Sequence, residues 1–166
     1  MGLLTDEIRA LVGTRRVYTA PEAFGAAAGR YFGLAIGDDN PLYSDPEFAR
    51  SHGLAGVTLP PTLVCETNQY AALPADAEGY AGHTWGLELP GTRQVRGGNR
   101  YVFGRRIRPD DVVTATWEIT DATEKTNRAG ADMLVVGSRA TYTNQDGEFL
   151  AENEETLIFI SLGGAA

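Results

Sequence analysis

The sequence is poor in residues that build disulfides or metal sites. Its 166 residues include one cysteine, Cys65, and two histidines, His52 and His83. A single cysteine cannot form a disulfide within the chain, and this usage is typical of a reducing cytoplasm. The three side chains are scattered without the spacing that metal ligands show. We therefore expect no disulfide, no metal and no other cofactor.

Long apolar runs and an excess of positive charge are missing as well. No run approaches the ~18 apolar residues that a membrane span needs. The first residues, Met-Gly-Leu-Leu-Thr-Asp-Glu, lack the basic region and apolar run of a signal peptide. The net charge of −8 argues against a nucleic-acid partner. These absences predict a cytoplasmic protein that binds neither membranes nor nucleic acid.

The first half of the chain has the signals of helices. Thr5 is placed to cap a short helix through Leu11, and Thr19 begins a capping box with a proline in its first turn. Gly37 ends that second helix, and Asp45 followed by a proline starts another short one. Two prolines then introduce an apolar stretch, residues 62–72, which we predict to be a central buried helix.

The second half has the signals of strands. Val113, Ala115, Trp117 and Ile119 alternate with polar residues, as in a strand with one buried face. The predicted strands cover residues 92–107, 112–123, 133–144 and 148–161, and the pair Gly97-Gly98 indicates a strand bulge or a close backbone approach. The sequence thus predicts one α+β domain over residues 1–166, an antiparallel sheet wrapped around the 62–72 helix. Its core spans about 17–160, and a loose tail ends the chain.

Arginines are concentrated in one stretch of this acidic chain. Six of the fourteen basic residues lie within sixteen positions: Arg93, Arg96, Arg100, Arg105, Arg106 and Arg108. One interpretation is a solvated strand face. The other is a local anion site, suited to the phosphates of coenzyme A or to the acidic surface of an acyl carrier protein.

One loop carries a recognisable motif. Gly37-Asp38-Asp39-Asn40-Pro41-Leu42-Tyr43-Ser44-Asp45 resembles the motif Gly-Asp-x-Asn-Pro-aliphatic-His-x-Asp of the MaoC-like (R)-specific hydratases and dehydratases, and eight of the nine positions agree. His52-Gly53-Leu54-Ala55-Gly56 and Leu59-Pro60-Pro61-Thr62 look like the N-terminal MaoC-like dehydratase domain. This family is related to the A and C subunits of mycobacterial hydroxyacyl-carrier-protein dehydratase. The resemblance covers residues 17–160 and implies a hot-dog fold.

The resemblance also implies a reaction, the removal of water from a 3-hydroxyacyl thioester. In catalytic members an aspartate and a histidine of this loop share the tasks of base and acid. Asp38 matches the aspartate, but Tyr43 occupies the place of the histidine. A phenol with an ordinary pKa near ~10 is a poor base at neutral pH, whereas imidazole is well matched to proton transfer.

Two interpretations of Tyr43 follow. In the first, the site is degenerate, and a catalytic MaoC-like subunit supplies the histidine in a heterodimer; a homodimer is then expected when the chain is alone. In the second, Asp38 and Tyr43 form an altered working pair. We also expect the acyl-coenzyme A or acyl-carrier-protein thioester to meet Asn40, Pro61, Thr62, Gly97 and Gly98, and, from the clustering of arginines, Arg93, Arg96 and Arg105.

Two other functions are alternatives to a dehydratase. A hot-dog thioesterase needs a carboxylate on the central helix, where Glu66 is the candidate, and the hydratase-like loop argues against it. A noncatalytic acyl-thioester-binding or scaffold protein is the third alternative. His52 and His83 are expected to be structural or at the surface, and Cys65 to be buried packing rather than a nucleophile.

Overall fold

The computed structural model describes residues 2–65 and 67–162. Its five strands form one antiparallel sheet in the order β1-β3-β4-β5-β2. The predicted α+β class is therefore confirmed. The predicted tail beyond residue 162 and the thioesterase candidate Glu66 lie outside the described residues. The strand bounds are β1 Arg15–Thr19, β2 Thr92–Phe103, β3 Thr114–Thr126, β4 Asp132–Thr143 and β5 Phe149–Ser161.

Three of the predicted helix signals are confirmed. Thr5 caps α1 (Asp6–Ala10) by accepting a hydrogen bond from the amide of Ile8. Asp45 caps α3 (Pro46–Ser51) in the same way, through two amides. The helix α2 (Gly25–Ile36) ends at Gly37, whose positive φ of 71° suits a residue without a side chain. Local capping chemistry thus fixes these ends.

The predicted helix start at Thr19 is wrong. Thr19 is the last residue of β1, and its hydroxyl lies 3.0 Å from the hydroxyl of Thr114 on β3. The helix begins six residues later, at Gly25. A five-residue strand that contains two arginines has little strand signal of its own, so its pairing with β3 outweighs the local capping pattern.

The predicted continuous helix over residues 62–72 is also wrong in its geometry. Its described residues form two short 3₁₀ helices, η2 (Pro61–Cys65) and η3 (Thr67–Tyr70), followed by a turn. The stretch is rich in β-branched and other weak helix formers, which lose side-chain freedom in an α-helix or compete for its hydrogen bonds. Leu63 and Val64 are nevertheless buried, so the segment covers the sheet as predicted.

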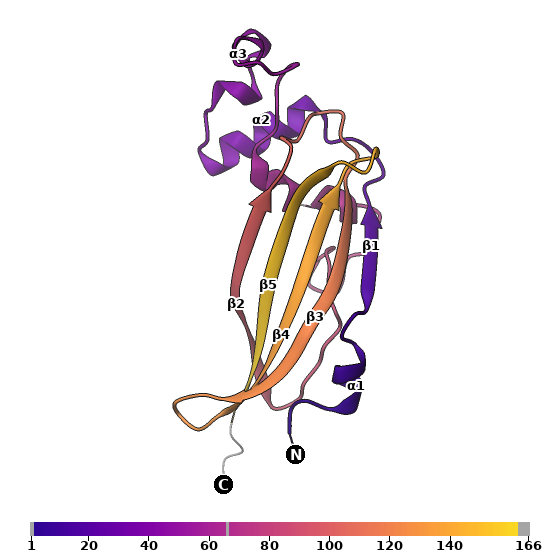
Figure 1. The fold of residues 1–166 in the computed structure, drawn as a ribbon, viewed down its shortest axis with the longest axis vertical. Coiled ribbons are helices and arrows are strands. Elements are labelled where there is room, and N and C mark those ends of the chain that lie inside the picture. The colour runs from indigo at the N-terminus through magenta and orange to yellow at the C-terminus, as the bar shows by residue number, and fades with distance from the viewer. Residues whose placement is uncertain (1, 66, 163–166) are drawn as a thin grey trace.

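The core lies on one face of the sheet. The alternation predicted in β3 is confirmed, because Ala115, Trp117 and Ile119 are buried. They pack in one cluster with residues of β4 and β5 and with Leu59, Leu63, Val64 and Trp85 from the segment that covers this face. Figure 1 shows α2 and α3 gathered beyond one end of the long strands and α1 beside the other end.

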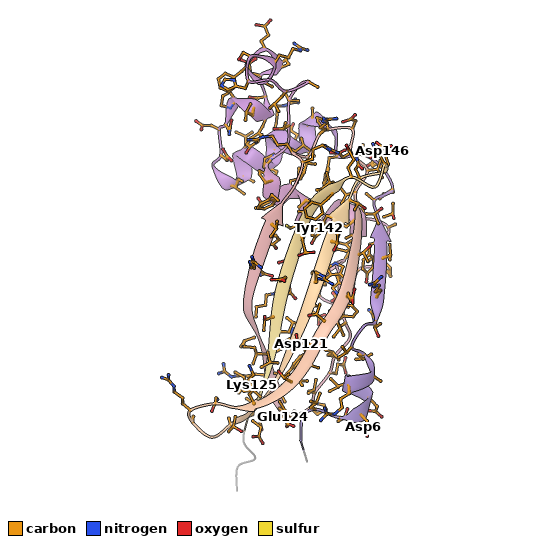
Figure 2. The ribbon with its side chains drawn as sticks, in the orientation of Figure 1. Asp6, Asp121, Glu124, Lys125, Tyr142 and Asp146 are labelled. Atoms are coloured by element: carbon orange, nitrogen blue, oxygen red, sulfur yellow. The ribbon has the colours of Figure 1, made fainter. Side chains whose placement is uncertain are left out.

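The two ends of the sheet differ in their side chains. Figure 2 places Asp146 in the β4–β5 turn near the α2 end, and Tyr142 on β4 below it, whereas Asp121, Glu124 and Lys125 lie toward the α1 end.

Within the described part of the chain, no helix is long and apolar enough to cross a membrane.

Candidate functional site

The motif loop is held against the end of α2. The amide of Asp38 donates a hydrogen bond to the carbonyl of Gly33, over 2.9 Å. A side chain at Gly33 would meet the carbonyl of Asp38 at 2.9 Å, which is closer than a Cβ atom tolerates. Glycine at this position therefore lets the loop turn back onto the helix, and this places Asp38 beside Tyr43.

The motif's polar side chains bind one another. The hydroxyl of Tyr43 donates to Oδ2 of Asp38 over 3.2 Å, and the amide of Asn40 donates to Oδ1 of Asp38, also over 3.2 Å. The side-chain oxygen of Asn40 accepts from the amide of Leu42 at the start of the 3₁₀ helix η1 (Pro41–Tyr43). Both carboxylate oxygens of Asp38 are thus engaged inside the loop.

Tyr43 is a buried hydrogen-bond donor. Only 6% of its side chain is exposed, and its ring lies 3.7 Å from where a Cβ atom at Gly33 would stand. Burial raises the pKa of the Tyr43 phenol, and the neighbouring Asp38 carboxylate raises it further, while the charge of Arg106 opposes this shift. A phenol held in its protonated form cannot serve as a base near neutral pH.

The two histidines have other partners than the motif loop's polar pair. His52 follows α3, where Nδ1 lies 2.8 Å from the carbonyl of Phe48. His83 lies on the covered face of the sheet, stacked on Trp117 with ring centroids 4.2 Å apart. In the described structure neither histidine is hydrogen-bonded to Asp38 or Tyr43. Nor does any group of three or more His, Cys, Asp and Glu among the described residues form a metal site.

An open cleft of about 630 Å³ lies between two loops, residues 53–58 and 105–110. The first loop is joined to the motif, because the amide of Thr58 donates to the carbonyl of Leu42 over 2.9 Å. Three of the predicted arginines line the second: Arg105, Arg106 and Arg108. The cleft therefore sets positive charge close to the motif loop.

Arg105 is held within the protein. Its guanidinium makes two hydrogen bonds to Asp111, over 2.7 and 3.1 Å, and an ion pair with Glu148 over 2.9 Å. Asp111 is 2% exposed and also accepts from the amide of Arg108 and from Asn144. These donors, Arg105 first among them, hold the pKa of Asp111 below its ordinary value against the effect of burial. Arg106 and Arg108 remain exposed.

The other predicted arginines do not form one patch with these. Arg96 pairs with Glu155 on the covered face, whereas Arg100 pairs with Glu154 on the opposite face, over 3.3 Å. Arg93 lies exposed near the start of β2. The structure thus divides the cluster between two faces of a strand and one cleft.

The remaining predicted residues fall in different places. Pro61 lines an apolar pocket of about 250 Å³ together with Phe103, while Thr62 is exposed. The pair Gly97-Gly98 forms the predicted bulge, because the register of β2 against β5 shifts between Arg96 and Gly98. A substrate role for any of these residues stays a prediction.

Sequence reasoning missed two features of this region. It did not identify loop 53–58 as a wall of the cleft, because residues 52–56 were noted only for their resemblance to the family. It gave no role to Asp111, whereas this side chain anchors Arg105 beside the β4–β5 hairpin. No local pattern links residues 105 and 111 to residue 148, because backbone pairing of Arg105 with Phe149 brings Glu148 to them.

Comparisons with known proteins agree with this architecture. The model of the FAS1-like, dehydratase domain region family matches residues 11–153. A protein of Thermobifida fusca named UPF0336 is 34% identical over 130 residues, which are 77% of this chain and 80% of that protein. The family match spans the motif loop, both walls of the cleft and most of the sheet.

Two solved structures have the same fold. The HadBC (3R-hydroxyacyl-ACP dehydratase) complex of Mycobacterium tuberculosis contains a chain with a TM-score of 0.60 and 25% identity, covering 89% of this chain and 96% of that one. A chain of the ChsH1-ChsH2 complex of the same organism has a TM-score of 0.68 and 17% identity, covering 96% and 94%. The hot-dog fold and the resemblance to MaoC-like dehydratases are confirmed.

Proposed function

This chain belongs to the FAS1-like dehydratase domain region family, and from that premise we propose that it is the noncatalytic subunit of an (R)-3-hydroxyacyl-thioester dehydratase or enoyl-thioester hydratase. A MaoC-like partner subunit would carry the histidine that Tyr43 replaces here. A reducing cytoplasm suits this assignment, given the single cysteine.

The proposal rests on the hydrogen bond that the Tyr43 hydroxyl donates to Asp38. Elimination of water requires a base for the C2 proton and an acid for the leaving hydroxyl. Here both carboxylate oxygens of Asp38 accept hydrogen bonds from the loop, and one of the donors is the buried Tyr43 hydroxyl. The loop therefore keeps the residues of the motif at eight of nine positions, while its carboxylate is engaged in the described structure.

The exposed edge of β2 supports a partner subunit. This strand is the last in the sheet, so one side of its backbone has no neighbouring strand among the described residues. Tyr101, Val102 and Phe103 near its end are 36%, 45% and 45% exposed. An open edge with apolar side chains favours pairing with another chain. HadBC and ChsH1-ChsH2 are named as complexes, which agrees with such an assembly.

The arginine cleft supports a substrate with an anionic carrier. Arg106 and Arg108 are exposed on a wall of the 630 Å³ cleft, in a chain whose net charge is −8. A local positive site of this kind attracts phosphates or an acidic protein surface. We infer that coenzyme A or an acyl carrier protein delivers the thioester here.

Hydration of a crotonyl thioester tests the assignment. The purified chain should be nearly inactive alone and should increase the activity of, or be required by, a MaoC-like subunit with an intact Gly-Asp-x-Asn-Pro-x-His motif. If the chain alone is fully active and Tyr43→Phe abolishes that activity, an Asp38–Tyr43 mechanism replaces the proposal. A chain that binds the thioester but never supports turnover with any such subunit would be a binding or scaffold protein.

Substitution of the cleft arginines tests the carrier. The double variant Arg106→Gln and Arg108→Gln should weaken thioester binding and flatten its salt dependence, because exposed charges are screened at high salt. Arg128→Gln, in the exposed turn after β3, is the matched control and should leave binding unchanged. Equal salt dependence in all variants would contradict the assignment of this cleft.

A further inference from the structure

A second, smaller cavity lies on the covered face of the sheet, with a volume of about 120 Å³. Its residues come from four strands and from the segment that covers them. Most of its lining is aromatic: Tyr70, Tyr80, His83, Tyr101, Trp117 and Tyr142. Aromatic rings attract cations through their negative faces, so walls of this composition favour a positively charged occupant.

The same wall contains a carboxylate. Glu155 is 8% exposed on β5, where its neighbours on the covered face include the buried Leu157. Its partner is Arg96, whose guanidinium donates to Oε2 of Glu155. The side chain of Arg96 is 63% exposed, so it reaches the carboxylate from the solvent side. The Arg96 guanidinium is therefore a cation that can dissociate from Glu155 and become solvated.

The bulge in β2 builds this arrangement. Side chains five residues apart on a regular strand point to opposite faces. The register shift after Arg96 sets Tyr101 opposite Asn153, so Arg96 and Tyr101 line the same cavity. A side chain at Gly97 would meet the terminal methyl of Ile158 at 2.9 Å, so Ile158 would have to shift to admit one.

Several buried polar atoms near Glu155 have no hydrogen-bond partner within the described structure. They are Oδ1 of Asn153, Nε2 of His83 and the hydroxyl of Ser138, which faces Glu155 across the β4–β5 pair. A buried acceptor without a donor costs free energy, so its persistence requires a reason. Asn153 is 2% exposed and lines the cavity, where a ligand N–H would satisfy it.

We propose that this cavity binds a small organic ammonium ion, and that Arg96 occupies its carboxylate until such a ligand displaces it. Glu155 pairs with the ammonium charge, the aromatic rings surround its carbon atoms, and Asn153 accepts an N–H. An anion would be repelled by Glu155, and a neutral molecule would not displace Arg96.

Two further properties agree with this assignment. Burial and the charge of Arg16 lower the pKa of His83 to about 3, so the imidazole is uncharged near neutral pH and does not repel a cation. A water molecule occupies about 30 Å³ of liquid, so the cavity has room for roughly four non-hydrogen atoms. Propylammonium has this size.

Titration of the full chain with propylammonium chloride tests the proposal, with calorimetry as the readout and tryptophan emission as a report from Trp117. Sodium chloride at equal ionic strength is the salt control, and propanol is the neutral isostere. We expect saturable binding of propylammonium alone. Tetramethylammonium, which lacks an N–H for Asn153 and has one more non-hydrogen atom than propylammonium, should bind more weakly.

The strand offers matched variants. Arg96→Ala should tighten propylammonium binding by up to about fivefold, since exposed ion pairs contribute that much to an equilibrium. Arg100→Ala removes the same charge on the opposite face and should change nothing. Glu155→Gln should weaken binding at least about tenfold, whereas Glu154→Gln should not.

Three results would overturn the assignment: equal responses to propylammonium and sodium, equal affinity for propanol, or the same effect of Arg96→Ala and Arg100→Ala. Equal affinity for tetramethylammonium would overturn the role of Asn153. Because Arg96 is exposed, its variant keeps the test decisive even if Glu155→Gln unfolds the chain. Binding is measured without any thioester, so the result is independent of the proposed dehydratase function.

Discussion

The motif loop and the aromatic cavity differ in how far their polar side chains are hydrogen-bonded. In the loop, Asp38 and Asn40 accept hydrogen bonds from the loop's own amides, and Tyr43 donates to Asp38. In the cavity, Asn153 and His83 keep buried atoms without partners in the described structure. The residues of the family motif thus hydrogen-bond to one another within their loop. Asn153 and His83 belong to no motif, and each keeps a buried polar atom without a partner in the described structure.

The comparison shows that a family motif can be present in a chain without fixing the chemistry of that chain. A motif can persist because its hydrogen bonds shape a loop, even where one substitution removes the base. An unsatisfied buried acceptor has a continuing cost and contributes nothing to the free protein's stability. The following four predictions probe the two regions, from the largest expected effect to the smallest.

Tyr43→His should give the loop the imidazole that the family motif has at this position. An imidazole beside Asp38 should raise hydration of a crotonyl thioester by the isolated chain about a hundredfold, the lower end of what a general acid–base group contributes. The assay compares initial rates for equal protein concentrations. Tyr80→His in the cavity wall is the control and should leave the rate unchanged. No increase would mean that the loop has lost more than its imidazole.

Tyr43→Phe should destabilise the fold by about 2 kcal/mol, because Asp38 loses a donor to its charged carboxylate in a partly buried place. Tyr80→Phe should cost under about 0.5 kcal/mol, since its hydroxyl bonds an exposed carbonyl. Urea unfolding measures both. Equal losses would contradict the structural role given to the Tyr43 hydroxyl.

The free energy of unfolding should depend on pH through His83. Its pKa is about 3 in the folded chain and about 6.5 when unfolded, so the unfolded state binds more protons between these values. Stability should therefore fall as pH drops below about 6.5, by at most about 1.4 kcal/mol per pH unit. His83→Gln should flatten this dependence, and His52→Gln should not. A slope unaffected by His83→Gln would show that other groups cause it.

Replacement of an asparagine by leucine should have opposite consequences in the two regions. Asn40→Leu removes the cap of η1 and should cost about 1 kcal/mol. Asn153→Leu removes an acceptor without a partner and should be neutral or slightly stabilising. Thermal unfolding of both variants gives the comparison. A loss at residue 153 as large as at residue 40 would indicate that Asn153 is already satisfied.

Parts of this outcome could be predicted because their causes are local. Thr5 and Asp45 cap helices through bonds to amides two or three residues away. The buried alternation of β3 and the bulge at Gly97-Gly98 depend on strand geometry and side-chain size. The missed strand β1 and the false start at Thr19 show the reverse case, where a partner from residue 114 onward decides the conformation.

The sequence by itself determined the fold class, the family resemblance and the tyrosine at the motif's histidine position, since motifs, alternation and capping act over a few neighbouring residues. Only the tertiary structure decided how the arginines are shared among two strand faces and a cleft, that Arg105 is held by Asp111, and that Arg96, Tyr101 and Glu155 meet in one cavity. The reason is physical: sheet register and burial join residues far apart in the sequence, 59 positions for Arg96 and Glu155 and 103 for Arg15 and Glu118, and no local pattern encodes which of them will meet.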